Sequence, residues 1–320
     1  MSGALAILDE VVSELAARGS QQARDEPAPD TLDAWWSAVR PATANWAEPV
    51  DRAIARGARA DRIAYAFAAG YQAALRRLVP ELADDAMVSL CITEAKGNHP
   101  RAIEARLTPD PASCGFRMSG EKRWATGSPQ AIELLVAARA GERSDGRPEI
   151  KLARVRGGAP GLVIEPMHGI AFVPEIAHGR VTLDDVMVAA SDVLPGDGYE
   201  RYVKPFRTIE DAHVAAALGA HLLALAFRFG WPREVRERLL AHLVAARALA
   251  VADPGSGATH LALAGLFAEQ GRLLLAIEPC WELADPATRA RWERDSALLS
   301  VAGTAREKRR EVAWNRLENR

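Results

Sequence analysis

The sequence predicts an α+β protein in which a β-rich segment lies between two helical blocks. From Val88 to Leu194 the apolar residues form short runs separated by Gly- and Pro-bearing turns, a spacing typical of a small barrel or sandwich. On both sides they recur at helical spacing with few glycines or prolines between them. We therefore expect an N-terminal helical domain (1–87), a middle antiparallel β-barrel or sandwich (88–196) and a C-terminal helical bundle (197–320).

The N-terminal block contains four segments of helical pattern. An amphipathic helix is expected over 5–15, followed by a polar link with two prolines at 18–30; further helices are expected from Thr31, from Trp46 and over 61–78. The helix expected from Thr31 carries Trp35 and Trp36, and on the 61–78 helix one face is formed by Ile63, Phe67, Tyr71, Ala74 and Leu78. Such a stripe is more often core than a cofactor contact, so we predict that these rings are buried.

The middle segment shows five short apolar runs, at 87–93, 131–139, 151–155, 162–165 and 180–183, with a polar hairpin loop at 141–148. The chain then becomes helical again, with helices expected over 209–227, 234–251 and 260–278 and one or two more from Pro286 to the end. The first is apolar on nearly all sides and should be buried. Antiparallel helices joined by short loops predict a bundle.

Composition and charge exclude several functions. The chain has 320 residues, of which 49% are hydrophobic and 26% charged, as is ordinary for a soluble globular protein. Its net charge of −2 provides no basic field for nucleic acid. No signal peptide and no apolar stretch of membrane-spanning length are evident, which favours a cytoplasmic protein. The three cysteines have no ligand spacing and are interpreted as small buried hydrophobes, and no histidine pair has metal spacing.

A family resemblance is carried by two motifs in the middle segment. Cys91-Ile-Thr-Glu94 is followed about thirty residues later by Gly120-Glu-Lys-Arg-Trp-Ala-Thr126, and the segments 182–188 and 194–198 continue the pattern. In this order and spacing they resemble the middle domain of acyl-CoA dehydrogenases, over roughly 75–320. The resemblance implies an α+β fold of that family, FAD as cofactor, and contacts to the flavin from Cys91, Ile92, Thr93, Trp124 and Thr126. The alternative is that β-branched and aromatic residues here simply favour strands.

Two departures weaken the side of the site that would hold the cofactor phosphates. The family's Gly-x-Gly-Ser-Asp run is replaced by Lys96-Gly-Asn-His99-Pro100, so its serine is absent. His99 is a candidate substrate contact or, equally, a solvated loop residue. The family also carries an arginine four residues before the glycine of a Phe-Gly pair, where it reaches a neighbouring subunit's pyrophosphate; that position is Ala226 here.

A third departure concerns the catalytic base. Taking a proton from the carbon beside a thioester needs a carboxylate in a dry pocket. The segment 300–304 resembles the family's Glu-Gly-Thr run but has Ala302 at the glutamate position. Glu210, early in the long apolar helix, is the remaining candidate base, although our alignment displaces it by one residue, about 100° around a helix. Its alternative role is that of a helix-start carboxylate.

Two functions follow from the resemblance. In the first, the chain belongs to an acyl-CoA dehydrogenase, an oxidoreductase of lipid metabolism that performs FAD-dependent α,β-dehydrogenation of an acyl-CoA thioester, as a subunit whose full-length partner supplies the base. In the second, it is a catalytically silent protein of the same fold with a binding or assembly role. The expected assembly is a homo-oligomer or a heterotetramer, and independent action with Glu210 as base ranks third.

Overall fold

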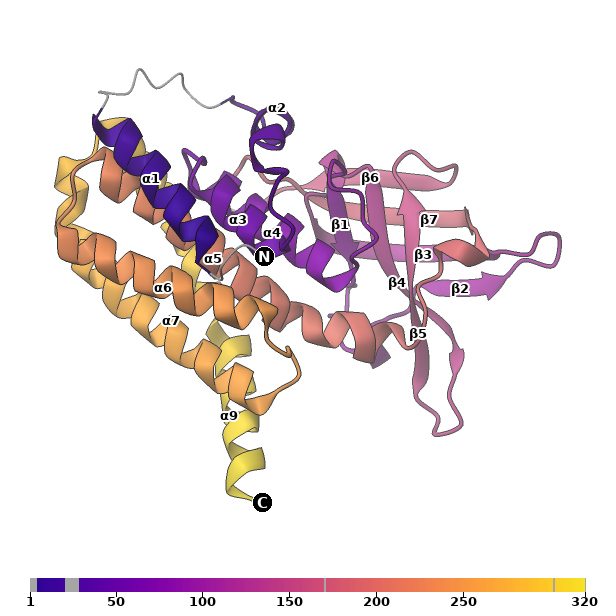
Figure 1. Ribbon diagram of the computed structural model, residues 1–320. Helices are drawn as coiled ribbons and strands as arrows, with labels where there is room; N and C mark the ends of the chain where they lie inside the picture. Colours follow the sequence, from indigo (N-terminus) through magenta and orange to yellow (C-terminus); the bar gives the residue numbers. More distant parts are fainter. Residues whose placement is uncertain (1–4, 21–28, 170, 302, 320) are drawn as a thin grey trace. The chain divides into compact units, whose positions relative to one another are not determined.

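The computed structural model describes residues 5–20, 29–169, 171–301 and 303–319. The helices are α1 (Ala6–Ser20), α2 (Leu32–Val39), α3 (Pro49–Gly57), α4 (Ile63–Leu78), α5 (Lys204–Arg228), α6 (Arg233–Val251), α7 (Gly257–Ile277), α8 (Pro286–Asp295) and α9 (Gly303–Glu318). The strands are β1 (Val88–Cys91), β2 (Arg106–Pro109), β3 (Phe116–Thr126), β4 (Glu133–Glu142), β5 (Pro148–Arg156), β6 (Leu162–Met167) and β7 (His178–Val188) (Figure 1). The chain thus has the predicted α+β composition, with helices at both ends and a central curled sheet.

The chain divides into two compact units. The helical unit comprises Met1–Arg77, Ala171–Glu175 and Thr208–Arg320, and the sheet unit comprises Leu78–Ile170 and Ile176–Arg207. Both predicted helical blocks therefore contribute to one unit, together with a short piece of the connection between β6 and β7. The division into three domains stays a prediction.

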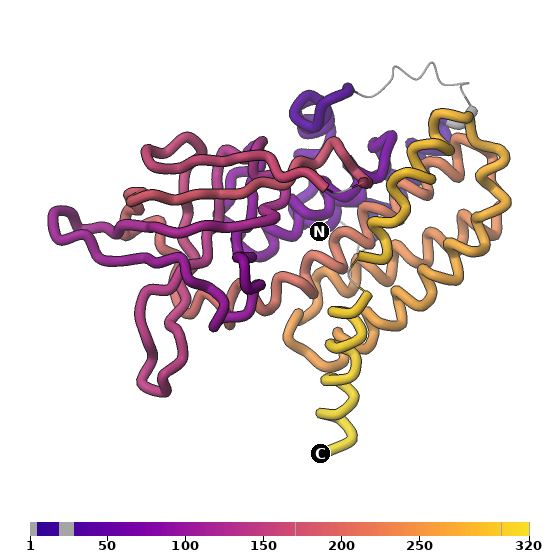
Figure 2. The backbone as a smooth tube through the Cα atoms, turned by 180° about the vertical axis from the view of Figure 1, so that it is seen from behind, coloured from indigo at the N-terminus to yellow at the C-terminus, as the bar shows by residue number. Residues whose placement is uncertain are grey.

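The sheet unit holds seven strands in the order β1-β4-β2-β3-β7-β6, with β5 also paired to β4. Most neighbours are antiparallel, as predicted, but β4 runs parallel to both β1 and β2. The β4–β5 hairpin extends well beyond the other strands (Figure 2). The predicted runs at 131–139, 151–155, 162–165 and 180–183 are all confirmed as parts of strands.

Inward-facing side chains of this sheet form one apolar core. It includes Leu134, Val136, Val181 and Val186, all of which are fully buried. On β7 the buried residues alternate with more exposed ones, whereas on β4 consecutive residues are buried. Gly120 lies at a register shift of β3 with φ of 147°, and a Cβ atom there would approach Ala105 to 2.6 Å. Only glycine fits this bend, so the bend is fixed by the sequence.

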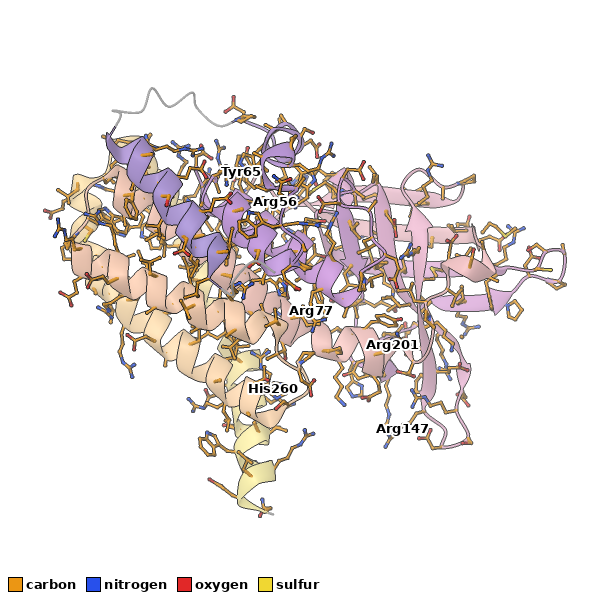
Figure 3. The ribbon with its side chains drawn as sticks, viewed as in Figure 1. Arg56, Tyr65, Arg77, Arg147, Arg201 and His260 are labelled. Atoms are coloured by element: carbon orange, nitrogen blue, oxygen red, sulfur yellow. The ribbon has the colours of Figure 1, made fainter. Side chains whose placement is uncertain are left out.

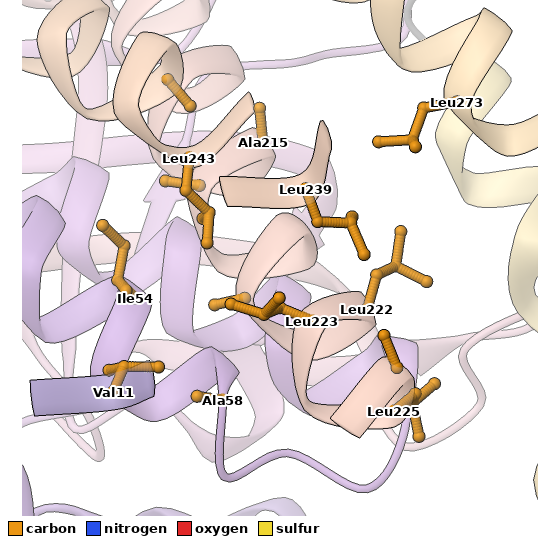
Figure 4. Packing of buried hydrophobic residues seen from close by; sticks show 14 of the residues in the cluster. Val11, Ile54, Ala58, Ala215, Leu222, Leu223, Leu225, Leu239, Leu243 and Leu273 are labelled. Carbon is orange, nitrogen blue, oxygen red and sulfur yellow. The ribbon is translucent and has the colours of Figure 1, made fainter. Parts of the chain in front are cut away.

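The helical unit is built around α5, as its apolar composition predicts. Alanines and leucines of α5 pack with α1, α3, α6 and α7 in one buried cluster, part of which is shown in Figure 4. Gly57 of α3 lies so close to α5 that a Cβ atom would meet the carbonyl oxygen of Ala217 at 2.2 Å. The small residues of both helices therefore permit a close backbone approach.

Most of the N-terminal aromatic residues are core, as predicted, although Phe67 of the predicted stripe is half-buried. Trp35 and Trp36 are each 2% exposed, and Trp35 stacks on Tyr65 with 4.8 Å between ring centroids. The guanidinium of the fully buried Arg56 lies over the Trp36 ring at 4.4 Å. Figure 3 shows Arg56 and Tyr65 on the neighbouring helices α3 and α4. Stacking and cation–π contact together account for this aromatic content.

Two sequence expectations are wrong. Cys114 is exposed in the β2–β3 turn, while Cys91 and Cys280 are buried as predicted; the turn's Asp-Pro-Ala-Ser sequence keeps the thiol away from the core. Two helical spans, Tyr199–Arg228 and Gly257–Leu283, do reach membrane-spanning length and hydropathy. The apolar stretch of the first is 89% buried within the protein and that of the second 28%. Core helices of soluble proteins also have this length and composition, so neither span identifies a membrane protein.

Candidate functional site

A bulge in β3 turns the predicted motif outward from the sheet. Lys122 pairs with Val181 and Ala125 with Gly179, so two residues of β3, Arg123 and Trp124, lie opposite the single intervening residue of β7. Lys122 and Ala125 are 0% and 2% exposed and face inward, whereas the Trp124 side chain is 44% exposed. The bulge therefore presents an indole on the outer face of the sheet.

Trp124 has a strained backbone at this point. Its φ is 57°, in the left-handed region that costs an ordinary residue about 1–2 kcal/mol. Its amide is displaced from the strand ladder and donates a hydrogen bond to Met167 Sδ at 3.3 Å. A bulky, exposed aromatic residue in a strained conformation is the kind of outlier that suggests a binding role.

The segment 92–94, which follows β1, lies beside this bulge. The carbonyl oxygen of Thr93 accepts a hydrogen bond from the amide of Arg123 at 2.7 Å. Thr126, two residues beyond Trp124 and on the other side of the inward Ala125, is half-buried on the outer face. The structure thus brings the Thr93 backbone next to the bulge that carries Trp124, with Thr126 two residues further along β3. A contact of these residues with a flavin stays a prediction.

A buried ion pair that was not predicted from the sequence lies beneath this surface. Lys122 Nζ lies 2.5 Å from Glu94 Oε1, and their side chains are 0% and 7% exposed. The Glu94 carboxylate also accepts hydrogen bonds from the amides of Glu104 and Ala105 at 2.7 and 3.1 Å. Burial lowers the pKa of Lys122, and Glu94 opposes that shift. The sequence indication of this pair was Lys122 itself, a charged residue at an inward-facing position of a strand.

The other two predicted cofactor residues differ in placement. Cys91 is fully buried, and burial raises the pKa of its thiol to about 12. Its side chain belongs to the sheet core, so any contact from Cys91 on the outer face would come from its backbone. Ile92 is half-buried, and its carbonyl oxygen accepts a hydrogen bond from Lys122 Nζ at 3.4 Å.

Two further outward residues lie next to the bulge and were not predicted. His178 pairs with Thr126 across the strands, and its ring centroid is 6.5 Å from that of Trp124, at a steep angle. Burial lowers the pKa of His178. Arg180, two residues on, occupies the position opposite the bulge and is half-buried. Both became visible only when the register of β3 and β7 fixed which residues share the outer face.

His99 lies in an exposed loop of the sheet unit. Its Nδ1 accepts a hydrogen bond from the amide of Arg101 at 3.3 Å, and its ring centroid lies 6.5 Å from that of Tyr199. This contact stabilises a short turn at Pro100–Ala102. A substrate contact from His99 stays a prediction.

The candidate base lies in the helical unit, where its neighbour is firmly paired. Glu210 is half-buried and lies more than one turn inside α5, so the helix-start role does not describe it. Asp211 is 4% exposed and binds Arg306 at 2.9 Å and Arg309 at 2.6 Å. Asp211 is therefore a structural carboxylate, while a catalytic role for Glu210 stays a prediction. Ala302, the position of the family's glutamate, lies outside the described residues.

The position of the family's interface arginine is not available for a polar contact. Ala226 is fully buried in the helical core, and the nearby Arg228 lies 3.5 Å from Asp285. Among the residues that the structure describes, no group of three or more His, Cys, Asp or Glu side chains could hold a metal ion.

Comparison with solved structures places this architecture among known folds. The chain is similar to the prolyl acyl carrier protein oxidase AnaB, with 14% identity and a TM-score of 0.68 over 97% of this chain and 98% of the other. It is similar to FMN-bound TdsC from Paenibacillus sp. A11-2, with 16% identity and a TM-score of 0.70 over 99% and 98%. A probable acyl-CoA dehydrogenase from Mycobacterium abscessus matches at 16% identity and a TM-score of 0.62 over 95% and 98%.

No protein-family model matches the sequence. At these identities the similarity concerns the fold, and the chain has the acyl-CoA dehydrogenase fold over nearly its whole length.

Proposed function

We propose that the protein is a flavin-dependent oxidoreductase that holds FAD against the outer face of its sheet unit and acts on an acyl thioester. The observation that carries the proposal is the 2.7 Å hydrogen bond from the Arg123 amide to the Thr93 carbonyl oxygen, which joins both halves of the motif. Similarity to flavin-containing structures supports it, since PigA is described with FAD and proline and TdsC with FMN.

The residues of the outer face fit an isoalloxazine ring. The exposed Trp124 indole offers a flat apolar surface, and the hydroxyl groups of Thr93 and Thr126 can pair with the ring's polar edge. The buried Glu94–Lys122 pair holds the strand ends that carry these groups. Without this internal support the bulge would be free to relax, so a preorganised surface is what the arrangement provides.

When bound, a flavin supplies the hydride acceptor, and the protein supplies orientation and dipoles. In this chain Trp124 and Thr126 would orient the ring, and their rigid backbone would limit its movement. Proton removal needs a carboxylate, and alanine occupies position 302. We therefore assign the base to a partner subunit, with Glu210 as the candidate if the chain acts alone.

The proposed substrate is an acyl-CoA thioester. An acyl group on a carrier protein is the second candidate, and the similarity to the prolyl acyl carrier protein oxidase AnaB favours it. Both present the same reacting group, a thioester with an acidic α-carbon. Turnover assays with each class distinguish them.

The proposed assembly is a homo-oligomer or a heterotetramer with a full-length acyl-CoA dehydrogenase in the cytoplasm. Large apolar side chains are exposed on α6, α7 and α9, including Val251, Leu275 and Trp314, which are 43%, 77% and 49% exposed. Exposed apolar residues of this size are typical of surfaces buried in an assembly. Light scattering of the purified chain, alone and with a co-expressed full-length homologue, measures the state directly.

The proposed function is tested by purifying the chain alone and together with a co-expressed full-length homologue. Flavin absorbance and thioester-dependent reduction in the co-purified complex would support the subunit role. Flavin and activity in the chain alone would assign the base to the chain itself, and Glu210→Gln would then abolish turnover. Flavin in neither preparation would favour the alternative, a catalytically silent protein of this fold with a binding or assembly role.

A further inference from the structure

Arg180 is a positive charge without a partner on the outer face of the sheet. It is half-buried, and its Nε atom is inaccessible to solvent and has no hydrogen-bond partner among the described residues. Within the same described part of the chain, its guanidinium forms no ion pair within 4.0 Å. Leaving a buried donor of a charged group unsatisfied is costly, so such a group suggests a missing acceptor.

The neighbours of Arg180 do not provide that acceptor. Across β7 and β3 it lies opposite the bulge, where Arg123 is already paired with Glu121 at 2.7 Å. On the other side its strand partner is Glu165 of β6, an exposed residue of opposite charge. A cross-strand pair could form an ion pair at this position, yet Arg180 Nε donates no hydrogen bond to the Glu165 carboxylate.

The chemistry of the surroundings identifies the class of ligand. Arg180 shares the outer face with the exposed Trp124 and with His178, so an aromatic surface and a fixed cation lie on adjacent positions of the sheet. A ligand that matches both has a planar ring and an anionic group. Guanidinium groups bind phosphate oxygens through paired, charge-assisted hydrogen bonds.

We propose that Arg180 binds the phosphate of the flavin nucleotide whose ring contacts Trp124, an inference that rests on the function proposed above. Arg180 on β7 supplies a cation from the sheet itself, opposite the bulge that carries Trp124. It acts as a positioning residue for the cofactor rather than for the substrate.

The test is a comparison of three flavins that differ in phosphate content. Riboflavin, FMN and FAD are titrated into the purified full chain, and binding is followed by the quenching of flavin fluorescence. Arg180→Gln should weaken FMN and FAD binding about 10- to 100-fold, as expected for loss of charge-assisted hydrogen bonds, and leave riboflavin binding unchanged. Arg180→Lys keeps the charge but not the paired geometry and should give an intermediate loss.

Arg147 provides the matched control. It lies at the tip of the β4–β5 hairpin, as Figure 3 shows, and its side chain is 71% exposed. Arg147→Gln removes the same charge from the same unit and should leave all three affinities unchanged. Thermal melts of each variant show whether the fold is retained; if Arg180→Gln does not fold, the Arg180→Lys series carries the comparison.

Two results with Arg180→Gln would contradict the role of Arg180 and leave the proposed function intact, and a third result would contradict both. If Arg180→Gln weakens riboflavin as much as FMN, or changes no affinity, Arg180 does not bind the phosphate, while the flavin surface stands. If the wild-type chain binds none of the three flavins, alone or with its co-expressed partner, the proposed function fails and the inference fails with it.

Discussion

Selected charged groups of the helical unit and of the outer face of the sheet unit differ in how they are paired. In the helical unit, Asp51 and Asp211 are 4% exposed, and each is held by arginine at 2.6 Å. On the outer face of the sheet, Arg180 has a buried nitrogen without a described partner, and Trp124 keeps a φ of 57°. The first arrangement is expected of residues selected for stability, and the second of residues selected for a ligand.

A network of charges around the β6–β7 connection extends the same contrast. Glu175 is bound by Arg62 at 3.2 Å and by Arg294 at 2.9 Å, and Arg291 binds Asp61 at 2.7 Å. All of these residues belong to the helical unit. The charged side chains of this network therefore pair with one another.

Lowering the pH should cause the largest loss of stability, and the helical unit should be destabilised first. His213 and His221 are buried on α5, where burial lowers the pKa of each from 6.5 to about 4. The unfolded chain takes up protons near pH 6.5 and the folded chain only near pH 4, so stability is complete above pH 6.5 and falls between these values. The loss should be about 3 kcal/mol per histidine, a large part of an ordinary domain's stability.

Thermal melts from pH 8 to pH 4, with hydrogen exchange to localise the opening, check this prediction. Charged groups near the two rings, Arg77 for His213 and Asp61 and Arg291 for His221, also affect these pKa values. The double variant His213→Gln/His221→Gln should flatten the slope. An unchanged slope in that variant would show that other groups cause the acid sensitivity.

Breaking the buried pair beneath the bulge should have the next largest effect. Glu94→Gln leaves the Lys122 ammonium, 0% exposed, without its counter-charge, and the free energy of unfolding should fall by about 3–5 kcal/mol. The exposed pair Lys96–Glu104, with side chains 70% and 62% exposed, is the control, and Glu104→Gln should have a much smaller effect because solvent screens the pair. Equal losses in denaturant unfolding would contradict the supporting role of the buried pair.

In the helical unit, Asp211→Asn should lower the free energy of unfolding by a smaller amount. The variant removes the counter-charge of Arg306 and Arg309, whose side chains are 20% and 13% exposed, and should cost about 2 kcal/mol in urea unfolding. Flavin affinity should not change, because Asp211 has no place in the proposed site. A loss of flavin with retained stability would move Asp211 into that site.

Trp124→Gly should have the smallest effect on stability and a clear one on binding. Glycine accepts the positive φ at no cost, so relief of strain should offset the lost side chain and keep stability within about 1 kcal/mol. Flavin affinity should fall about tenfold with the loss of ring contact. Trp314→Gly, on α9 and 49% exposed, should instead destabilise its helix and leave flavin affinity unchanged. The reverse pattern would make Trp124 a structural residue.

Periodicity in the sequence predicts most of the fold. The apolar helix expected over 209–227 is the centre of α5, and Thr31 begins α2 as its N-cap, accepting a hydrogen bond from the Ala34 amide. Local spacing determines such elements, so one chain suffices to find them. The parallel pairing of β1 with β4 could not be predicted, because the partner of a strand depends on contacts distant in sequence.

The site was predicted in part for the same reason. Thr93, Trp124 and Thr126 were found by motif, and the structure brings them together. The pair of Glu94 with Lys122 joins positions 28 residues apart. A lysine at an inward-facing strand position indicates a buried partner, but the local sequence does not identify which residue that partner is. Arg180 was missed because the bulge shifts the register by one residue, and that shift decides which side chains face outward.

Flavin binding by the purified protein is the most direct test of the central claim. This claim is that the β3 bulge and the segment 92–94, which follows β1, form one wall for a flavin. The measurement is FAD titration of the wild-type chain and of Trp124→Gly, each alone and co-purified with a full-length partner, followed by flavin fluorescence. The account predicts saturable binding of FAD by the wild type in at least one preparation and about tenfold weaker binding by the variant. Binding that is absent in both preparations, or identical in wild type and variant, would contradict it.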